Sequence, residues 1–127
     1  MNMKMIWATL RPEKINDAIS NMEKAGFYAF TRLDVMGRGR QKGIMVGSSR
    51  YEEVAKTTLL VVVEDQEADR AVETLKIAAR TGNPGDGKIF VSPLGAVYSI
   101  RTKSRDARSD LDNLLIRVGP GIPGVGL

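Results

Sequence analysis

The feature that most restricts the fold is a strand–helix–strand pattern that occurs twice along the chain. In each copy an apolar run is followed by a helical stripe, a glycine at the helix end and a second apolar run. Gly26 and Gly82 stand where a left-handed helix cap is expected. Two such units form a ferredoxin-like α+β sandwich of four antiparallel strands with two helices on one face. The predicted strands are residues 5–10, 27–35, 59–63 and 88–91.

Both predicted helices carry apolar residues at helical spacing. Pro12 suits the first turn of the first helix, where its missing N–H costs nothing. Acidic and amide residues at 64–67 precede the second stripe, at a helix start where the dipole favours negative charge. The two stripes are Ile15, Ala18, Ile19, Met22 and Ala25, and Ala68, Ala71, Val72, Leu75, Ala78 and Ala79.

One face of the predicted sheet has no helix to cover it. Residues 59–63 form a near-continuous apolar run, which is typical of a strand that is buried on both faces. Two or three copies packed sheet to sheet would cover the second face. We therefore predict an oligomer.

A glycine-rich connection, Thr-Gly-Asn-Pro-Gly-Asp-Gly-Lys at residues 81–88, joins the second helix to the last strand. Its glycines allow backbone conformations that side chains forbid, and successive N–H groups in such a turn make a concave site for an anion. Lys88 adds a positive charge at the exit. The segment is not a Walker loop, which lies after a strand and before a helix. On these residues alone, a phosphate-binding loop and an ordinary glycine-rich connection both remain open.

The character of the chain changes at residue 37. Residues 37–50 hold four glycines, four basic residues and no acid, and neither helical nor strand periodicity is evident. We interpret residues 37–55 as a long exposed loop without regular structure. Loops of this length are usually functional or disordered, so we expect it to be mobile and to be ordered by a ligand or partner.

Composition excludes several classes of chemistry. The 127 residues suit one domain, and no apolar run approaches the roughly 18 residues of a membrane span. The absence of cysteine and histidine excludes disulfides, thiol chemistry, ordinary zinc sites and histidine bases. The N-terminus has no secretory h-region, which favours the cytoplasm. A net charge of +4 fits either a polyanionic partner or simple solubility, and so small an excess favours solubility.

The order Thr-x-x-x-Gly-Asp-Gly-Lys-Ile-Phe at residues 81–90 resembles the B-loop signature of the PII signalling proteins. The resemblance extends from about residue 3 to residue 101. It implies a trimer of the ferredoxin-like fold, with ATP or ADP bound in the clefts between neighbouring subunits. Carried over by position, the residues expected to hold the nucleotide and its Mg²⁺ are Thr31, Gly39, Arg40, Gln41, Val62, Gly85, Asp86, Gly87, Lys88 and Arg101.

The resemblance also implies separate roles within this set. Residues 85–88 would hold the phosphates, and Arg40 and Gln41 would contact the polyphosphate and its Mg²⁺. Thr31 and Val62 would border the adenine.

One position departs from the family pattern. PII proteins commonly have two arginines two residues apart in the C-loop, and here these positions hold Ser99 and Arg101. Arg101 would reach the nucleotide of the next subunit. The loss of the other cation puts the nucleotide affinity, or the preference for ATP over ADP, in doubt.

Lys56 precedes an apolar strand, where a solvated strand-edge lysine is the ordinary interpretation. In PII proteins the lysine at this place binds the carboxylates of 2-oxoglutarate, which chelates the ATP-bound Mg²⁺. The resemblance therefore implies a 2-oxoglutarate site formed by Lys56, Gln41, Lys42 and Gly43, with Gln41 contacting the metal.

The loop at residues 37–55 resembles one branch of the family. It is short and lacks the Tyr-Arg-Gly-Ala-Glu-Tyr segment of the widespread PII proteins, and Tyr51 lies in Ser-Arg-Tyr-Glu-Glu, so we do not assign it as a modification site. The chain is similar to the nitrogenase-associated PII branch of archaea and some anaerobes. This implies a homotrimer, or a mixed assembly with a sister PII chain, that inhibits dinitrogenase until 2-oxoglutarate and ATP relieve the inhibition. Arg38, Arg50 and Tyr51 are the expected partner contacts.

These features predict a domain over residues 1–103 with a T-loop at about 37–55, and a partly flexible C-terminal extension over 104–127. A regulator of an ammonium transporter is the alternative within the family. RNA binding would need exposed aromatics on the central strands, where only Phe90 occurs. No carboxylate pair suggests acid–base catalysis. We expect a regulator, not an enzyme, with no nucleic-acid partner and no membrane insertion.

Overall fold

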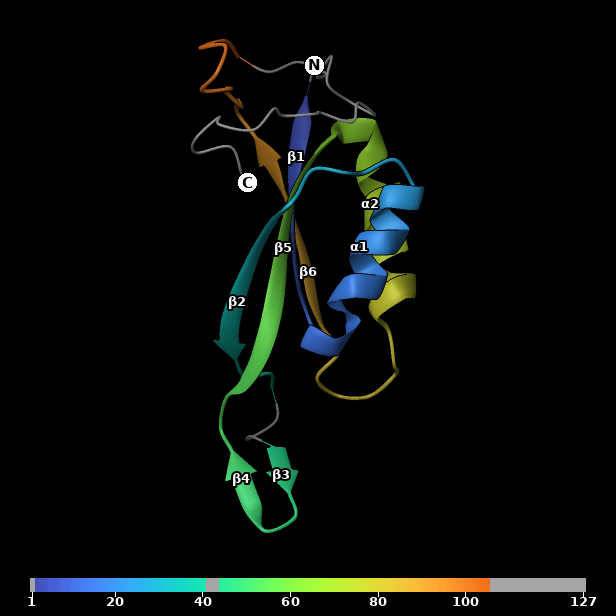
Figure 1. Cartoon of the computed structure of the whole chain (residues 1–127), viewed down its shortest axis with the longest axis vertical. Helices are drawn as coiled ribbons and strands as arrows, with labels where there is room; N and C mark the ends of the chain where they lie inside the picture. Colours follow the sequence, from blue (N-terminus) through green and yellow to red (C-terminus); the bar gives the residue numbers. More distant parts are fainter. Residues whose placement is uncertain (1, 41–43, 106–127) are drawn as a thin grey trace, which may run out of the picture.

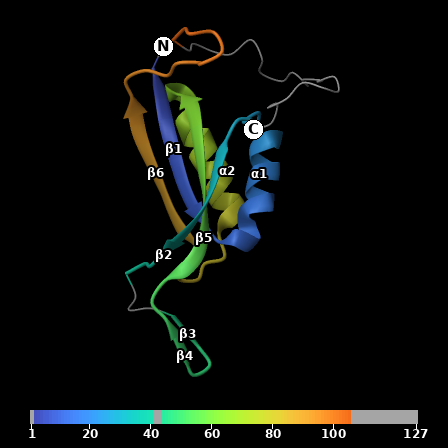
Figure 2. The same ribbon diagram turned by 60° about the vertical axis from the view of Figure 1, so that its left-hand side comes forward.

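The computed structural model describes residues 2–40 and 44–105. Four strands form one antiparallel sheet in the order β2–β5–β1–β6, and both α-helices pack on the same face of it (Figures 1 and 2). This is the predicted ferredoxin-like sandwich. The elements are β1 (Met3–Leu10), the 3₁₀ turn η1 (Pro12–Lys14), α1 (Ile15–Lys24), β2 (Thr31–Gly37), β3 (Ile44–Val46), β4 (Ser49–Tyr51), β5 (Val54–Glu64), the 3₁₀ turn η2 (Asp65–Glu67), α2 (Ala68–Ala79) and β6 (Gly87–Leu94).

The core lies between the sheet and the helices. Alternate residues of β1 are buried against the helices, and the antiparallel register places Ile6 beside Val61 and Ala8 beside Leu59. The helices contribute the predicted stripes, with Ala25, Ile19, Val72 and Ala78 at their edges rather than fully buried. The fully buried core is Ile6, Ala8, Leu10, Ile15, Ala18, Met22, Leu59, Val61, Val63, Ala68, Ala71, Leu75 and Ala79.

The second strand begins later than predicted. β2 starts at Thr31 rather than at residue 27, because residues 25–27 close the end of α1. Gly26 has a φ of +93°, and the N–H of Phe27 donates to the carbonyl of Met22 at 2.8 Å. This is the hydrogen-bond pattern of a Schellman cap. The Arg70 guanidinium lies 4.5 Å above the Phe27 ring, so that segment packs on α2 instead of joining the sheet.

The prediction of a structureless loop over residues 37–55 was wrong at its far end. β3 and β4 form a hairpin there, in which Ile44 pairs with Tyr51 and Val46 with Ser49. The two-residue turn begins at Gly47 with a φ of +59°, and glycine favours such turns because they need left-handed backbone. β5 already starts at Val54.

The chain after β6 forms a turn. Tyr98 and Arg105 make a single β-bridge, and the N–H of Ser99 donates to Ser104 at 3.0 Å. Most of the C-terminal extension predicted over residues 104–127 lies outside the described residues.

The sheet face opposite the helices carries exposed apolar side chains. The register places Phe90, Trp7 and Leu60 in one row across it. Trp7 is 42% exposed, Val62 42% and Phe90 59%, high values for side chains of this size within a sheet. This confirms the prediction that the helices leave one face of the sheet uncovered. No helix among the described residues is long and apolar enough to cross a membrane.

Candidate functional site

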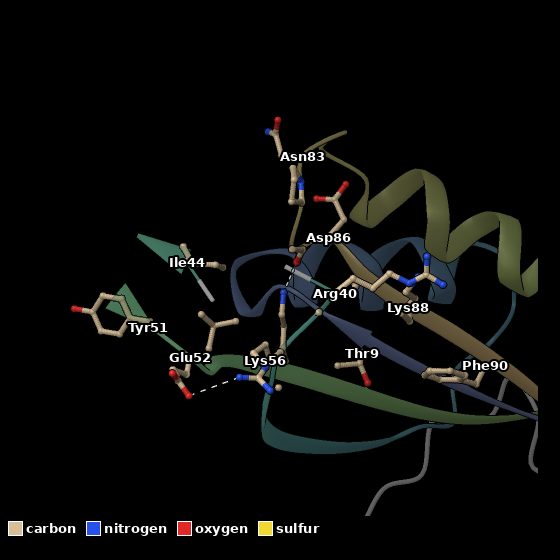
Figure 3. A pocket seen from close by; sticks show the side chains of 17 residues that line it. Thr9, Arg40, Ile44, Tyr51, Glu52, Lys56, Asn83, Asp86, Lys88 and Phe90 are labelled. Carbon is tan, nitrogen blue, oxygen red and sulfur yellow. Dashed lines mark hydrogen bonds and ion pairs between the residues drawn. The ribbon is translucent and has the colours of Figure 1, made fainter. Parts of the chain in front are cut away.

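The hairpin of β3 and β4 extends away from one end of the sheet (Figure 1). A pocket of about 460 Å³ opens at that end (Figure 3). One wall is the loop between α2 and β6, and another is the strand end and hairpin around residues 37–40 and 44–54. Its polar lining is rich in cations. The residues that line it are Thr9, Gly37, Arg38, Gly39, Arg40, Ile44, Tyr51, Glu52, Val54, Lys56, Asn83, Pro84, Gly85, Asp86, Gly87, Lys88 and Phe90.

Glycines set the path of the loop wall. Gly82, Gly85 and Gly87 have φ values of +88°, +99° and +111°, in the left-handed region that other residues rarely adopt. Gly87 also opens β6, where it pairs with Leu10. A Cβ atom at Gly87 would lie 1.9 Å from the Thr9 carbonyl oxygen, so only glycine lets the loop enter the sheet here.

The carboxylate of Asp86, itself a residue of the loop, lies in the concave turn of the loop. Oδ2 of Asp86 accepts the backbone N–H groups of Thr81 at 2.9 Å and Gly82 at 2.8 Å. Oδ1 accepts the Thr81 hydroxyl and, at 3.0 Å, the Nε–H of Arg11. The Thr81 hydroxyl foremost, then its backbone N–H and Arg11, hold the pKa of the Asp86 carboxyl well below its usual range. The Asp86 side chain is therefore an ionised structural brace.

Arg11 was not predicted from the sequence as part of this region. It follows β1 directly and is separated by 75 residues from Asp86, with which it pairs. Its Nη2 donates to the Pro84 carbonyl at 2.8 Å, so the guanidinium contacts two neighbouring parts of the loop. The only sequence sign was an arginine just before Pro12, at a point where the chain leaves a strand.

Lys56 joins the sheet to the same loop. It projects from β5 toward the loop between α2 and β6, and its ammonium group donates to the Gly85 carbonyl (Figure 3). Burial lowers the pKa of Lys56, and the nearby Arg11 guanidinium lowers it further, while Glu13 and Asp86 act in the opposite direction. The Lys56 side chain lines the pocket, so Lys56 is not the solvated lysine at a strand edge that was the ordinary interpretation.

The hairpin wall is held by a bridging acid. Glu52 lies 3.6 Å from Arg38 and 3.7 Å from Arg50, so it joins the two arginines among the three predicted partner contacts (Figure 3 draws the first pair). Glu52 was not singled out in the sequence. Tyr51 lines the pocket beside Glu52.

The structure brings together much of the predicted site and separates the rest. Gly39, Arg40, Lys56 and residues 85–88 line one pocket, whereas Thr31, Val62 and Arg101 do not. Thr31 and Val62 pair with Leu60 and Met5 along the sheet, away from the hairpin end. Arg101 follows β6, at the end of that strand opposite Gly87. Gln41, Lys42 and Gly43 lie outside the described residues.

Fold and site together define a ferredoxin-like α+β protein with a glycine-rich, cation-lined pocket at one end of its sheet. The chain belongs to the P-II family: the family model described as "Nitrogen regulatory protein P-II" matches residues 3–104. The predicted resemblance is thereby confirmed. So is the prediction of a regulator, since this family is regulatory and not enzymatic.

The similar proteins include members from nitrogen-fixation regions. The "Nitrogen fixation nifHD region GlnB-like protein 1" of Methanothermococcus thermolithotrophicus is 49% identical over 100 residues, 79% of this chain and 95% of that one. A nifHD1-region GlnB-like protein 1 of Methanosarcina barkeri is 48% identical over 100 residues, with the same coverage. Among solved structures, Arabidopsis thaliana PII bound to citrate is 32% identical, with a TM-score of 0.70 and coverage of 83% of this chain and 89% of that one. The predicted branch is supported by these relatives.

Proposed function

We propose that this protein is a cytoplasmic PII-type regulator that senses ATP or ADP together with 2-oxoglutarate and controls nitrogenase by direct binding. The observation that carries the proposal is the convergence of Lys56, residues 39–40 and residues 85–88 on one pocket. These groups come from three separate parts of the chain.

The electrostatics of the pocket suit a polyphosphate. Arg40 and Lys88 line it, and arginine binds phosphate oxygens through charge-assisted hydrogen bonds. The acidic Asp86 does not oppose this, because its carboxylate is turned into the loop and paired with Arg11. The pocket therefore fits a nucleotide polyphosphate. Mg²⁺ would neutralise phosphate charge there, with Gln41 as its expected protein ligand.

The open sheet face favours a trimer as the working form. Trp7, Val62 and Phe90 would be removed from water if copies of the chain packed sheet to sheet. We propose that in this trimer the turn at residues 95–105 of one copy lies at the pocket of another, as the family resemblance implies for Arg101. That arrangement would give Arg101 the role in nucleotide binding that its own chain's geometry does not give it, and would place Thr31 and Val62 at the same cleft.

The hairpin is the part suited to a partner. Met45 is 60% exposed and Val46 62%, and these apolar tips stand beyond the body of the domain (Figure 1). Arg50 pairs with Met45 across the hairpin and Tyr51 with Ile44, and Arg38 lies 3.6 Å from Glu52, just after the hairpin. We propose that ligands in the pocket alter the hairpin, since Ile44, Tyr51 and Glu52 line that pocket, and that the hairpin in turn contacts dinitrogenase.

Calorimetric titration of 2-oxoglutarate, with and without Mg-ATP, tests this function. We expect binding only with Mg-ATP, and its loss in Lys56→Ala, because that variant removes the cation facing the effector carboxylates. Lys76→Ala is the matched control, since Lys76 is an exposed lysine on α2. Binding of ATP without any response to 2-oxoglutarate would refute the nitrogen-sensing part. Binding to dinitrogenase, followed in parallel, would distinguish that target from an ammonium transporter.

A further inference from the structure

Arg11 connects the end of β1 to the middle of the loop at residues 81–87. Its Nε donates to Asp86 at 3.0 Å and its Nη2 to the Pro84 carbonyl at 2.8 Å. The side chain is 23% exposed, which is low for an arginine in a small domain. It also lies against the turn itself, since a Cβ built on Gly85 would be 3.2 Å from Nη2.

The loop has few other attachments at this point. Its two ends are fixed by α2 and β6, but residues 81–84 between them are exposed. Lys56 holds the Gly85 carbonyl from the sheet side, and Arg11 holds the neighbouring Pro84 carbonyl and the Asp86 carboxylate. A guanidinium suits such a position because its rigid fork binds two acceptors in fixed directions.

We propose that Arg11 is a positioning residue that fixes the loop in its binding conformation without touching the ligand; this rests on the proposed nucleotide function. Arg11 does not line the pocket, although its neighbours Thr9 and Asp86 do. Its charge is matched by Asp86 and, at 4.0 Å, by Glu13. The guanidinium is thus engaged within the protein. A loop held in place before binding loses less entropy when the ligand arrives, and binds more tightly.

Calorimetric ATP titration of Arg11→Met and Arg11→Lys tests the role. We expect Arg11→Met to weaken ATP binding about tenfold, the effect of losing charge-assisted contacts that hold the loop. Arg11→Lys should recover part of the affinity, because lysine restores the pair with Asp86 but cannot also hold Pro84 in a fork. Arg80→Met is the matched control: it removes an exposed arginine beside the same loop. A tenfold loss in this control would assign the effect to general charge and overturn the proposal.

A double-mutant cycle with Asp86→Asn separates positioning from direct contact. If Arg11 acts through Asp86, Arg11→Met should cost less than about threefold in the Asp86→Asn background. A full tenfold loss there would show that Arg11 does not act through Asp86 and would refute the proposal. Thermal unfolding of each variant checks that the domain remains folded.

Amide hydrogen exchange provides a readout that needs no ligand. The N–H groups of Thr81 and Gly82 donate to Asp86, so Arg11→Met should speed their exchange, and Arg11→Lys should restore part of the protection. Unchanged exchange in Arg11→Met would overturn the proposal even if ATP affinity fell. If the wild-type protein bound no ATP, the nucleotide function would fail, while exchange would still decide whether Arg11 fixes the loop.

Discussion

The loop at residues 81–87 and the hairpin segment at residues 44–53 form two walls of one pocket, but they are held in different ways. In the loop, Asp86 accepts hydrogen bonds from Thr81, Gly82 and Arg11, and the backbone adopts left-handed conformations at its glycines. The hairpin is held by its own short ladder and by ion pairs of Glu52 at 3.6 and 3.7 Å. All three side chains in those ion pairs are more than half exposed.

Under the proposed function, the loop must keep its shape and the hairpin must change its shape. A network of inward hydrogen bonds around an ionised carboxylate holds one geometry, as binding of a phosphate requires. Exposed ion pairs contribute only about 0–1 kcal/mol and are screened by salt, so the hairpin is easily displaced. A segment with few buried apolar contacts opens at low cost. The hairpin therefore suits the part of a regulator that responds to ligand and partner.

Gly87→Ala should disrupt the conformation of the loop at residues 81–87, and it has the largest expected effect on stability. The added Cβ would lie 1.9 Å from the Thr9 carbonyl oxygen, at a φ of +111° that alanine rarely adopts. Because the obstacle is backbone within the sheet, we expect a loss of about 3–4 kcal/mol in the free energy of unfolding. Thermal and urea unfolding measure it.

Gly95→Ala is the control for that substitution. Gly95 also adjoins β6, but an added Cβ there would meet no atom within 4 Å, and its backbone is not left-handed. We expect less than about 0.5 kcal/mol of change. A similar loss in both variants would mean that the cost is general to this strand, and that the loop is not held as its contacts indicate.

Asp86→Asn should loosen the loop wall without a clash. The amide keeps one acceptor oxygen but loses the charge that pairs with Arg11, so we expect a loss of about 1 kcal/mol. The folded pKa of Asp86 is lowered from its ordinary value of 3.8, so the carboxylate's contribution is fully present above that value. It is lost as the pH falls below 3.8 toward the folded pKa.

The stability difference between wild type and Asp86→Asn should therefore be constant above about pH 5 and shrink below about pH 4. Urea unfolding at a series of pH values measures it. Glu23→Gln, an exposed acid at the end of α1, should show little difference at any pH. A difference for Asp86→Asn that did not change between pH 7 and pH 3 would contradict the inference that ionised Asp86 braces the loop.

What could be predicted from the sequence depended on whether the signal was local. The stripe of α1 and the cap at Gly26 follow from spacing within one turn of helix, and both are present. The start of β2 was missed because Phe27 makes its contacts with α1 and with Arg70 on α2. The hairpin was missed although its turn, Gly47-Ser48 between two short apolar or aromatic runs, is a recognisable local signal.

The residues of the site divide in the same way, into those with a signal in the sequence and those without one. Lys56 and residues 85–88 were predicted because a fixed order of residues resembles a known family, and the structure places them in one pocket. Arg11 was not, because it acts through a partner that only folding brings near: Asp86 lies 75 residues from Arg11 along the chain. Glu52 was not either, although Arg50, one of its two partners, is close to it in the sequence. A single arginine or glutamate in an exposed segment carries no sign of its contact.

Glu52→Gln should perturb the hairpin wall alone and has the smallest expected effect on stability. The amide cannot pair by charge with Arg38 or Arg50, yet these exposed contacts are weak, so we expect a change below about 0.5 kcal/mol. Amide exchange should quicken for β3 and β4 while Thr81 and Gly82 keep their protection, because the loop depends on Asp86 instead. Glu53→Gln, the neighbouring exposed acid, should leave both walls unchanged. If Glu52→Gln instead lowered protection in the loop as much as in the hairpin, the two walls would form one cooperative unit. The hairpin could then not move without disturbing the loop at residues 81–87, and the proposed signal from ligand to partner would have to pass through both walls together.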